Sequence, residues 1–180
     1  VCESTQGIEY YASEGTNHTW TLTNATLASG SGTDSISVDF PIQNTTHQLQ
    51  VLIENQYGCT SQPEKTVIVN TRPDSLIFGP DTVCESTQGI EYYASEGTSH
   101  TWTLTNATLA SGAGTDSIAV DFGIQDTLHL LQVLIENQFG CTSEAERTVV
   151  VNTRPDSLIF GPDTVCKLTN NIAYYTSPGT

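Results

Sequence analysis

Cysteine is the residue type whose spacing in this chain most directly suggests chemistry. The 180 residues contain five cysteines, and the separation between Cys2 and Cys59 recurs between Cys84 and Cys141. Cys166 is the fifth, and a partner at the same spacing would lie beyond the end of the sequence. Regular spacing of this kind predicts a disulfide framework, which is typical of oxidising, extracellular compartments.

The cysteines belong to a repeat with a period of 82 residues. Residues 1–82 align with residues 83–164 without a gap, and 70 of the 82 positions are identical. A third, diverged copy starts at Val165. A fixed period of this length predicts an array of small domains. We expect one domain over 1–72 that lacks its first strand, a complete domain over 73–154, and the start of a third over 155–180.

Composition excludes several classes of partner. The formal net charge is −15, and only five residues are Lys or Arg. Nucleic acid and anionic membrane surfaces are therefore poor partners, because phosphate binding requires clustered cations. A hydrophobic content of 37% argues against disorder, and no apolar run approaches the roughly 20 residues of a membrane span. An acidic, Ser/Thr/Asn-rich chain without methionine is typical of extracellular proteins.

Alternation with a period of two, rich in β-branched and aromatic residues, predicts strands rather than helices. Short segments rich in Gly, Pro, Asn and Ser separate the strands and are typical of turns. Seven short strands with regular turns predict an all-β fold of tandem antiparallel β-sandwiches. The expected strands of the complete domain are 75–78, 82–85, 89–94, 100–105, 116–122, 128–136 and 147–152.

This strand order leads to a prediction for the disulfides. The strands that carry Cys84 and Cys141 should run parallel along one edge, with both cysteines near one end of the domain. A link from Cys59 to Cys84 would instead span about one domain length, whereas a disulfide tolerates only ~4.4–6.8 Å between Cα atoms. The sequence therefore predicts Cys2–Cys59 and Cys84–Cys141, with Cys166 unpaired.

Several motifs of the repeat resemble a known family. They are Gly-Pro-Asp-Thr-Val-Cys at 79–84, Tyr-Tyr at 92–93, His-Thr-Trp-Thr-Leu at 100–104, Gly-Thr-Asp-Ser-Ile-Ala-Val-Asp-Phe at 114–122, and Asn-Gln-Phe-Gly-Cys at 137–141. Together they resemble the PKD-like/immunoglobulin-like repeats of Bacteroidota surface proteins. That resemblance implies a place in a long secreted adhesin or gliding-motility protein exported by the type IX system.

One short motif recurs through the chain, in which Asp is followed by Ser or Thr and then by an aliphatic residue. It is consistent with a turn that enters a strand. It also resembles the O-glycosylation signal of secreted Bacteroidota proteins, and both interpretations stay open. The candidate acceptors are Ser35, Ser75, Thr82, Ser117, Thr127, Ser157 and Thr164.

The segment between domains is short and contains a proline. It reads Asn-Thr-Arg-Pro-Asp at 70–74 and again at 152–156. Because proline fixes φ and glycine is absent, we expect limited freedom between neighbours. Arg72 and Arg154 are the only positive charges there, and each is predicted to pair with a carboxylate such as Asp74 or Asp156, or with one in the adjoining domain.

Four aspartates flank these boundaries and could bind Ca²⁺ through their oxygens, or could be exposed solubilising charges. They are Asp74, Asp81, Asp156 and Asp163. No metal site is predicted at histidine, because His18, His47, His100 and His129 have no second His or Cys at ligand spacing. Trp20 and Trp102 are expected in the core rather than as sugar-stacking platforms.

We find no catalytic constellation, since no nucleophile has an evident base, and we expect a protein that is not an enzyme. The favoured function is a structural spacer or stalk repeat of a long, secreted cell-surface adhesin or filament. Its partners would be neighbouring repeats of the same chain, and possible outer partners are surface polysaccharide or other cells. The alternatives are a carbohydrate-binding or accessory module of a secreted hydrolase, and a fragment of an immunoglobulin-like receptor.

Overall fold

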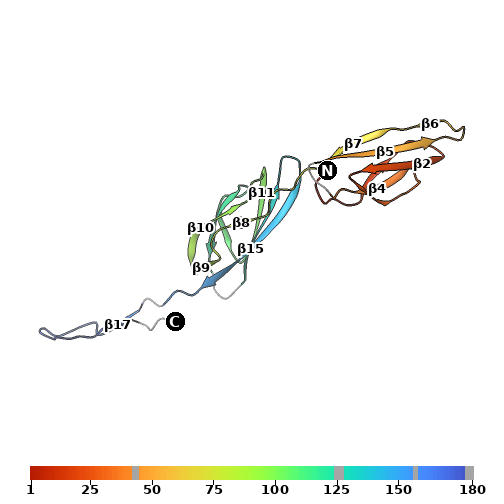
Figure 1. The fold of residues 1–180 in the computed structure, drawn as a ribbon. Coiled ribbons are helices and arrows are strands. Elements are labelled where there is room, and N and C mark those ends of the chain that lie inside the picture. Colours follow the sequence, from red (N-terminus) through yellow and green to blue (C-terminus); the bar gives the residue numbers. More distant parts are fainter. Residues whose placement is uncertain (42–44, 124–127, 156–157, 177–180) are drawn as a thin grey trace.

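A computed structural model describes residues 1–41, 45–123, 128–155 and 158–176. Two β-sandwiches and a C-terminal hairpin follow one another along an elongated molecule (Figure 1). We call residues 1–72 repeat 1, residues 73–154 repeat 2 and residues 155–180 the third copy. The predicted all-β fold of tandem antiparallel sandwiches is confirmed. Among the described residues, no helix is long and apolar enough to span a membrane.

Repeat 2 consists of two four-stranded sheets. The first contains, in spatial order, β12 (Thr108–Ser111), β13 (Ser117–Phe122), β10 (Thr87–Ala94) and β8 (Ile77–Phe78). The second contains β11 (Ser99–Thr105), β14 (His129–Glu136), β15 (Thr142–Asn152) and β9 (Thr82–Cys84). All these pairings are antiparallel except that of β9 with β15, which is parallel.

Repeat 1 follows the same plan. One sheet holds β1 (Ile8–Tyr11), β4 (Ser35–Asp39) and β3 (Thr26–Ser29). The other holds β2 (Asn17–Thr23), β5 (Thr46–Glu54), β6 (Thr60–Ser61) and β7 (Glu64–Ile68). The described residues of repeat 1 include no counterpart of β8. The third copy contributes the hairpin of β16 (Ile159–Phe160) and β17 (Tyr175–Thr176).

Each repeat has its own hydrophobic core, made by the alternation that the sequence displays. Ile118, Val120 and Phe122 point inward from β13, and the residues between them are half-buried. The same positions of repeat 1 form a second, separate cluster. Each core includes an edge-to-face contact between a phenylalanine and a histidine ring. In repeat 2 the ring centroids of Phe122 and His129 are 5.6 Å apart. Because each core is separate, each repeat buries its apolar residues without its neighbour.

Two features of repeat 2 differ from the strands expected from the sequence. Strand β12 was not predicted, and β15 begins at Thr142 rather than at 147. In β12 every residue is exposed except the half-buried Leu109, and between Thr142 and Glu146 only Ala145 is buried. Such segments show little hydrophobic alternation, because pairing with a neighbouring strand, rather than burial, makes them strands.

Gly79 allows the chain to cross from the first sheet of repeat 2 to the second. Its φ is +149°, and a Cβ at this position would lie 2.3 Å from Cδ1 of Tyr92. The Tyr92 hydroxyl donates a hydrogen bond to the Pro80 carbonyl at 3.0 Å. Arg147 donates to the Ile77 carbonyl at 2.7 Å and pairs with Asp81 at 2.6 Å. The tyrosine ring thus packs on bare backbone, and the arginine fixes both sides of the crossing.

The described residues of the third copy, 158–176, form a hairpin and keep part of this crossing. A Cβ at Gly161 would meet the Tyr174 ring at 2.3 Å, and Tyr174 donates to the Pro162 carbonyl at 3.3 Å. Ile159, however, is 75% exposed, whereas its counterpart Ile77 is 7% exposed. Local contacts therefore specify the crossing, and the apolar strand is buried only when the rest of a repeat covers it.

Burial of Tyr92 predicts a loss of stability at alkaline pH. Desolvation raises its pKa from 10.0 to about 12, with the nearby Arg147 charge opposing this change. The unfolded chain ionises near pH 10 and the folded chain only near pH 12, so this contribution is complete below pH 10 and is lost as pH rises between these values. We expect Tyr92→Phe to weaken this pH dependence of the unfolding midpoint in urea. If the wild type and Tyr92→Phe lost stability to the same extent between pH 10 and pH 12, the assignment of this loss to Tyr92 would be wrong.

Candidate functional site: the junction between repeats

A disulfide joins the two repeats. Cys2 of repeat 1 is bonded to Cys141 of repeat 2, with an S–S distance of 2.06 Å and a Cα–Cα distance of 5.5 Å. Cys59, Cys84 and Cys166 are exposed free thiols. The predicted pairs Cys2–Cys59 and Cys84–Cys141 are therefore wrong.

The register of one strand pair explains the error. Strand β9 does run parallel to β15, as expected, but it pairs with the last three residues of β15, so Cys84 lies opposite Asn152. Cys141 directly precedes the first residue of β15, an 11-residue strand. At about 3.3 Å per residue, the two cysteines are roughly 36 Å apart, at opposite ends of the repeat. A disulfide within the repeat is geometrically excluded.

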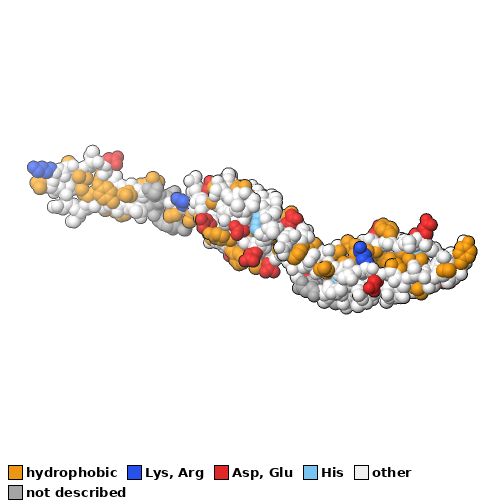
Figure 2. All heavy atoms as spheres, turned by 90° about the horizontal axis from the view of Figure 1, so that it is seen from above, with side chains coloured by type: hydrophobic (Ala, Val, Ile, Leu, Met, Phe, Trp, Pro, Cys, Tyr) orange, Lys and Arg blue, Asp and Glu red, His pale blue; other side chains and the backbone are white. Residues whose placement is uncertain are grey.

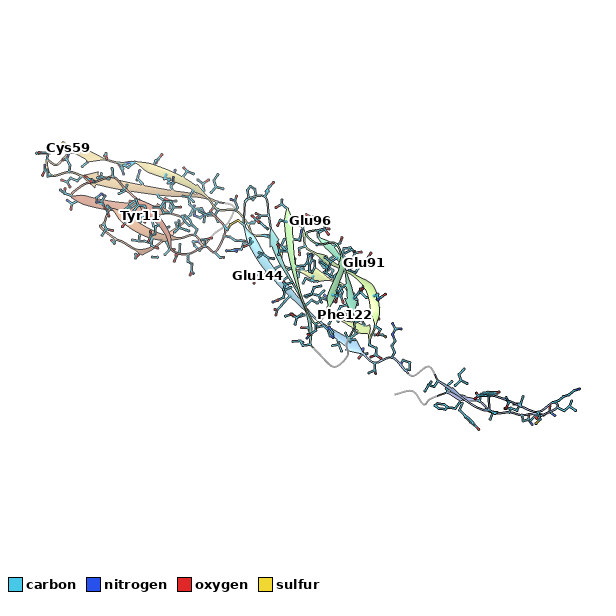
Figure 3. All side chains as sticks on the ribbon, turned by 180° about the vertical axis from the view of Figure 1, so that it is seen from behind. Tyr11, Cys59, Glu91, Glu96, Phe122 and Glu144 are labelled. Atoms are coloured by element: carbon cyan, nitrogen blue, oxygen red, sulfur yellow. A yellow bond between two sulfur atoms is a disulfide. The ribbon has the colours of Figure 1, made fainter. Side chains whose placement is uncertain are left out.

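The same arrangement places Cys2 at the end of repeat 1 that faces repeat 2. Cys2 forms an isolated parallel bridge with Asn70, next to the segment that connects the repeats. The N-terminus accordingly lies beside the boundary between the repeats (Figure 1). Cys59 lies at the outer end of repeat 1, far from repeat 2 (Figure 3).

Asn137 shapes the loop that carries Cys141 and also docks it. Its side-chain oxygen accepts hydrogen bonds from the backbone N–H groups of Phe139 at 3.0 Å and Cys141 at 3.1 Å. Its side-chain nitrogen donates to the Thr71 carbonyl of the connecting segment at 2.8 Å. One side chain therefore holds the cysteine in position and binds the neighbouring repeat.

Arg72 forms the third link across the junction. Its Nη1 donates to the Thr142 carbonyl of repeat 2 at 2.6 Å, and its Nε donates to the Glu3 carbonyl of repeat 1 at 3.2 Å. The Glu3 carboxylate accepts from the Arg72 backbone N–H at 2.7 Å rather than from the guanidinium. The prediction that the Arg72 side chain pairs with a carboxylate such as Asp74 is therefore wrong, because its Nε and Nη1 donate to carbonyl oxygens.

A disulfide, two polar contacts and Pro73 together restrict bending and twisting between the repeats. The polar contacts are exposed or partly buried, so each contributes on the order of 1 kcal/mol. The covalent link dominates, and it can open only by reduction or thiol exchange. The junction can thus hold two domains at a fixed angle, which is a mechanical rather than a catalytic capability.

Asn137 and Asn55 offer a matched test of the docking contact. Asn55 shapes the corresponding loop of repeat 1 in the same way, accepting from Tyr57 at 2.9 Å and Cys59 at 3.1 Å. We expect Asn137→Ala to increase relative motion of the repeats, measured by residual dipolar couplings on each domain. Asn55→Ala should leave that motion unchanged, because its loop lies at the outer end. Equal effects of the two substitutions would show that only loop folding matters.

The aspartates proposed for Ca²⁺ have different surroundings. Asp74 lines a hollow at the junction together with Glu3 and Glu96, whereas Asp81 pairs with Arg147. Asp163 is exposed on the third copy, and Asp156 lies outside the described residues. Across the described ranges, no group of three or more His, Cys, Asp or Glu side chains is arranged to hold a metal ion. Calcium binding stays a prediction.

The candidate O-glycosylation residues divide by exposure. Ser75, Thr82 and Thr164 are exposed, and Ser35 and Ser117 are half-buried at the start of strands. Thr127 and Ser157 lie outside the described residues. Exposure makes the first three accessible to a modifying enzyme, and modification itself stays a prediction.

Both tryptophans and His100 form hydrogen bonds with backbone carbonyls of their own repeats. Trp102 packs against the core of repeat 2 and donates to the Thr115 carbonyl at 2.9 Å. Trp20 packs against the core of repeat 1 and donates to the Thr33 carbonyl at 2.9 Å. His100 is buried and bonds the Ser95 carbonyl through Nε2 at 2.9 Å. Acidic side chains are dispersed over both repeats (Figure 2).

Comparison with known proteins supports the type of domain. Residues 71–151 match the family model of the PKD-like domain. This match covers most of repeat 2 and agrees with the PKD-like/immunoglobulin-like resemblance of the sequence motifs. No curated protein matches the chain.

Several solved structures are similar to the chain at low identity. The protocadherin gammaB7 EC3-6 cis-dimer has 10% identity and a TM-score of 0.35, with 86% of this chain and 45% of that chain covered. The human desmocollin-1 ectodomain has 11% identity and a TM-score of 0.31, with 84% and 34% covered. The Bacteroides ovatus mixed-linkage glucan utilization locus SGBP-B, in complex with a mixed-linkage heptasaccharide, has 16% identity and a TM-score of 0.29, with 84% and 42% covered. The chain therefore spans less than half the length of each of these three.

Proposed function

We propose that this chain is a structural spacer in which cross-linked junctions hold successive repeats in a stiff rod. The Cys2–Cys141 bond between repeats carries this proposal. A disulfide that served only to stabilise a small domain would lie within that domain. Here each core is complete within its repeat, and the covalent link goes to the boundary.

The setting we propose is a secreted, extracellular protein at the cell surface. Disulfides persist in oxidising compartments, and a net charge of −15 keeps a repetitive chain soluble. The resemblance of the motifs suggests a Bacteroidota adhesin or gliding-motility filament exported by the type IX system. In that setting the rod would carry a binding surface away from the cell, and the repeats would have no catalytic role.

Attached glycans would add to this role by covering an extended surface. We expect protein from its native source to exceed the polypeptide mass by multiples of a glycan, mapping first to the exposed Ser75, Thr82 and Thr164. Intact-mass analysis followed by peptide mapping measures this. An unmodified native protein would leave the Asp-Ser/Thr motif as a turn that enters a strand.

Scattering from chains with increasing numbers of repeats tests the rod. Each repeat adds about 35–40 Å if the junction angle is fixed, because β15 alone extends about 36 Å at 3.3 Å per residue. The maximum dimension from small-angle scattering should then grow linearly with repeat number. Growth close to a square-root law would indicate flexible beads and would overturn the proposal.

A further inference from the structure

We propose that Cys84, at the far end of repeat 2, forms a disulfide with the loop cysteine of a following repeat in the same chain. That loop cysteine would be the counterpart of Cys141. The inference rests on the proposed spacer function and extends it, since every junction of an array would then be cross-linked in the same way.

The surroundings of Cys84 reproduce those of Cys2, which is bonded to the next repeat in this same structure. Cys84 lies opposite Asn152 in a parallel pair, as Cys2 lies opposite Asn70. The Glu85 N–H donates to the Asn152 carbonyl at 2.8 Å, and the corresponding distance in repeat 1 is 2.9 Å. The backbone arrangement that surrounds Cys2 at the junction is therefore also present around Cys84.

Arg154 shows where the partner's contribution is missing. Its backbone N–H donates to the Glu85 carboxylate at 2.9 Å, matching the Arg72–Glu3 contact of 2.7 Å. Its side chain, however, turns back to the Thr87 hydroxyl at 3.5 Å, whereas Arg72 reaches the carbonyl of Thr142 in the next repeat at 2.6 Å. A docked loop would supply Arg154 with the corresponding carbonyl.

The other half of a junction is also formed in advance, at the opposite end of the molecule. The Asn55 side chain holds the loop of repeat 1 in the same form that Asn137 gives to the docked loop of repeat 2. Cys59 is exposed at the tip of this loop (Figure 3). Each repeat thus has one cysteine at each end, suited to its two neighbours. Formation of the bond oxidises two thiols and reduces one oxidised glutathione to two molecules of glutathione.

Repeated cross-links would give the array a short covalent route along its axis. Between Cys59 and Cys84 the chain runs through β6, β7, the connecting segment, β8 and β9, from the outer end of repeat 1 to the far end of repeat 2. This route has 25 residues, which extend to roughly 85 Å, close to two domain lengths. Residues 85–140, which include most of the core of repeat 2, are not part of this covalent route. The array would therefore resist extension even where a repeat unfolds.

The test uses a longer chain in which residues 99–164 are repeated after Thr180, so that the third copy is complete. In the added segment, Tyr replaces the residue that corresponds to Phe139, so that its loop peptide differs in mass from residues 137–144. The chain is oxidised in a glutathione buffer, alkylated and cut after glutamate, which separates all the cysteines. We expect residues 65–85 to be linked to the added loop peptide and residues 1–3 to residues 137–144. Alkylation should then leave Cys59 and Cys166 as the labelled thiols.

Two variants of this longer chain are matched controls. Cys84→Ser should free the added loop cysteine for alkylation and leave the Cys2–Cys141 link unchanged. Cys59→Ser should change neither link. An alkylated Cys84 beside an intact Cys2–Cys141 link would overturn this inference and leave the proposed function standing. Loss of the Cys2–Cys141 link itself would overturn the proposed function.

Discussion

Reduction of one disulfide should release about 470 Å of additional chain when a single molecule is stretched between its ends. The Cys2–Cys141 bond closes a loop of 139 residues in sequence. Each residue of a stretched chain contributes about 3.4 Å. While the bond is intact, pulling force passes from Cys2 directly to Cys141, so neither core can contribute its length even after it unfolds. Force spectroscopy with and without reductant measures the difference.

Cysteine variants separate this bond from the alternatives. Cys141→Ser should behave like reduced protein in the absence of reductant. Cys59→Ser should behave like the oxidised wild type, because its thiol is free. If Cys59→Ser instead lengthened the chain that can be extended, a disulfide within repeat 1 would be present and the cross-linked junction would be refuted.

Phe122→Ala should destabilise repeat 2 by about 3–5 kcal/mol, the range for removing a large aromatic side chain from a core. Phe122 is 1% exposed and contacts the rings of both Tyr92 and His129. Because the two cores are separate, repeat 1 should keep its own stability, and denaturant unfolding should split into two transitions.

Phe139→Ala is the matched control within the same repeat. Phe139 is 56% exposed in the docked loop, so its loss should cost under about 1 kcal/mol. Repeat 1 provides a natural comparison, since it has Tyr57 at this position. A single cooperative transition in Phe122→Ala, with both repeats lost together, would show that the junction couples folding as well as orientation.

The sandwich could be predicted because its signals are local. Alternation such as that of Ile118, Val120 and Phe122 places side chains on one face of a strand whatever its neighbours are. The Gly79–Tyr92 packing is local as well, since the third copy forms it with Gly161 and Tyr174. Short edge segments such as Thr108–Ser111, in which only Leu109 is half-buried, carry no such signal and were missed.

The junction could not be predicted because it depends on register between distant strands. The expected strand order made the strand of Cys84 parallel to the last strand of the repeat, near Cys141, and β9 and β15 are indeed parallel. Which end of β15 meets Cys84 is set by pairing across the sheet, and an error of one strand length changes the disulfide partner. The docking role of Asn137 was hidden for a related reason, because Asn55 has the same sequence context but its loop lies at the outer end of repeat 1.

A peptide map of the oxidised 180-residue chain tests the central claim most directly. Cleavage after glutamate places the five cysteines on five different peptides, namely 1–3, 55–64, 65–85, 137–144 and 147–180. The chain should be denatured in alkylating reagent before digestion, so that no thiol exchanges. We predict one cross-linked species, residues 1–3 joined to 137–144, with the other three peptides alkylated. Residues 1–3 joined to 55–64, together with 65–85 joined to 137–144, would contradict a covalent junction between repeats.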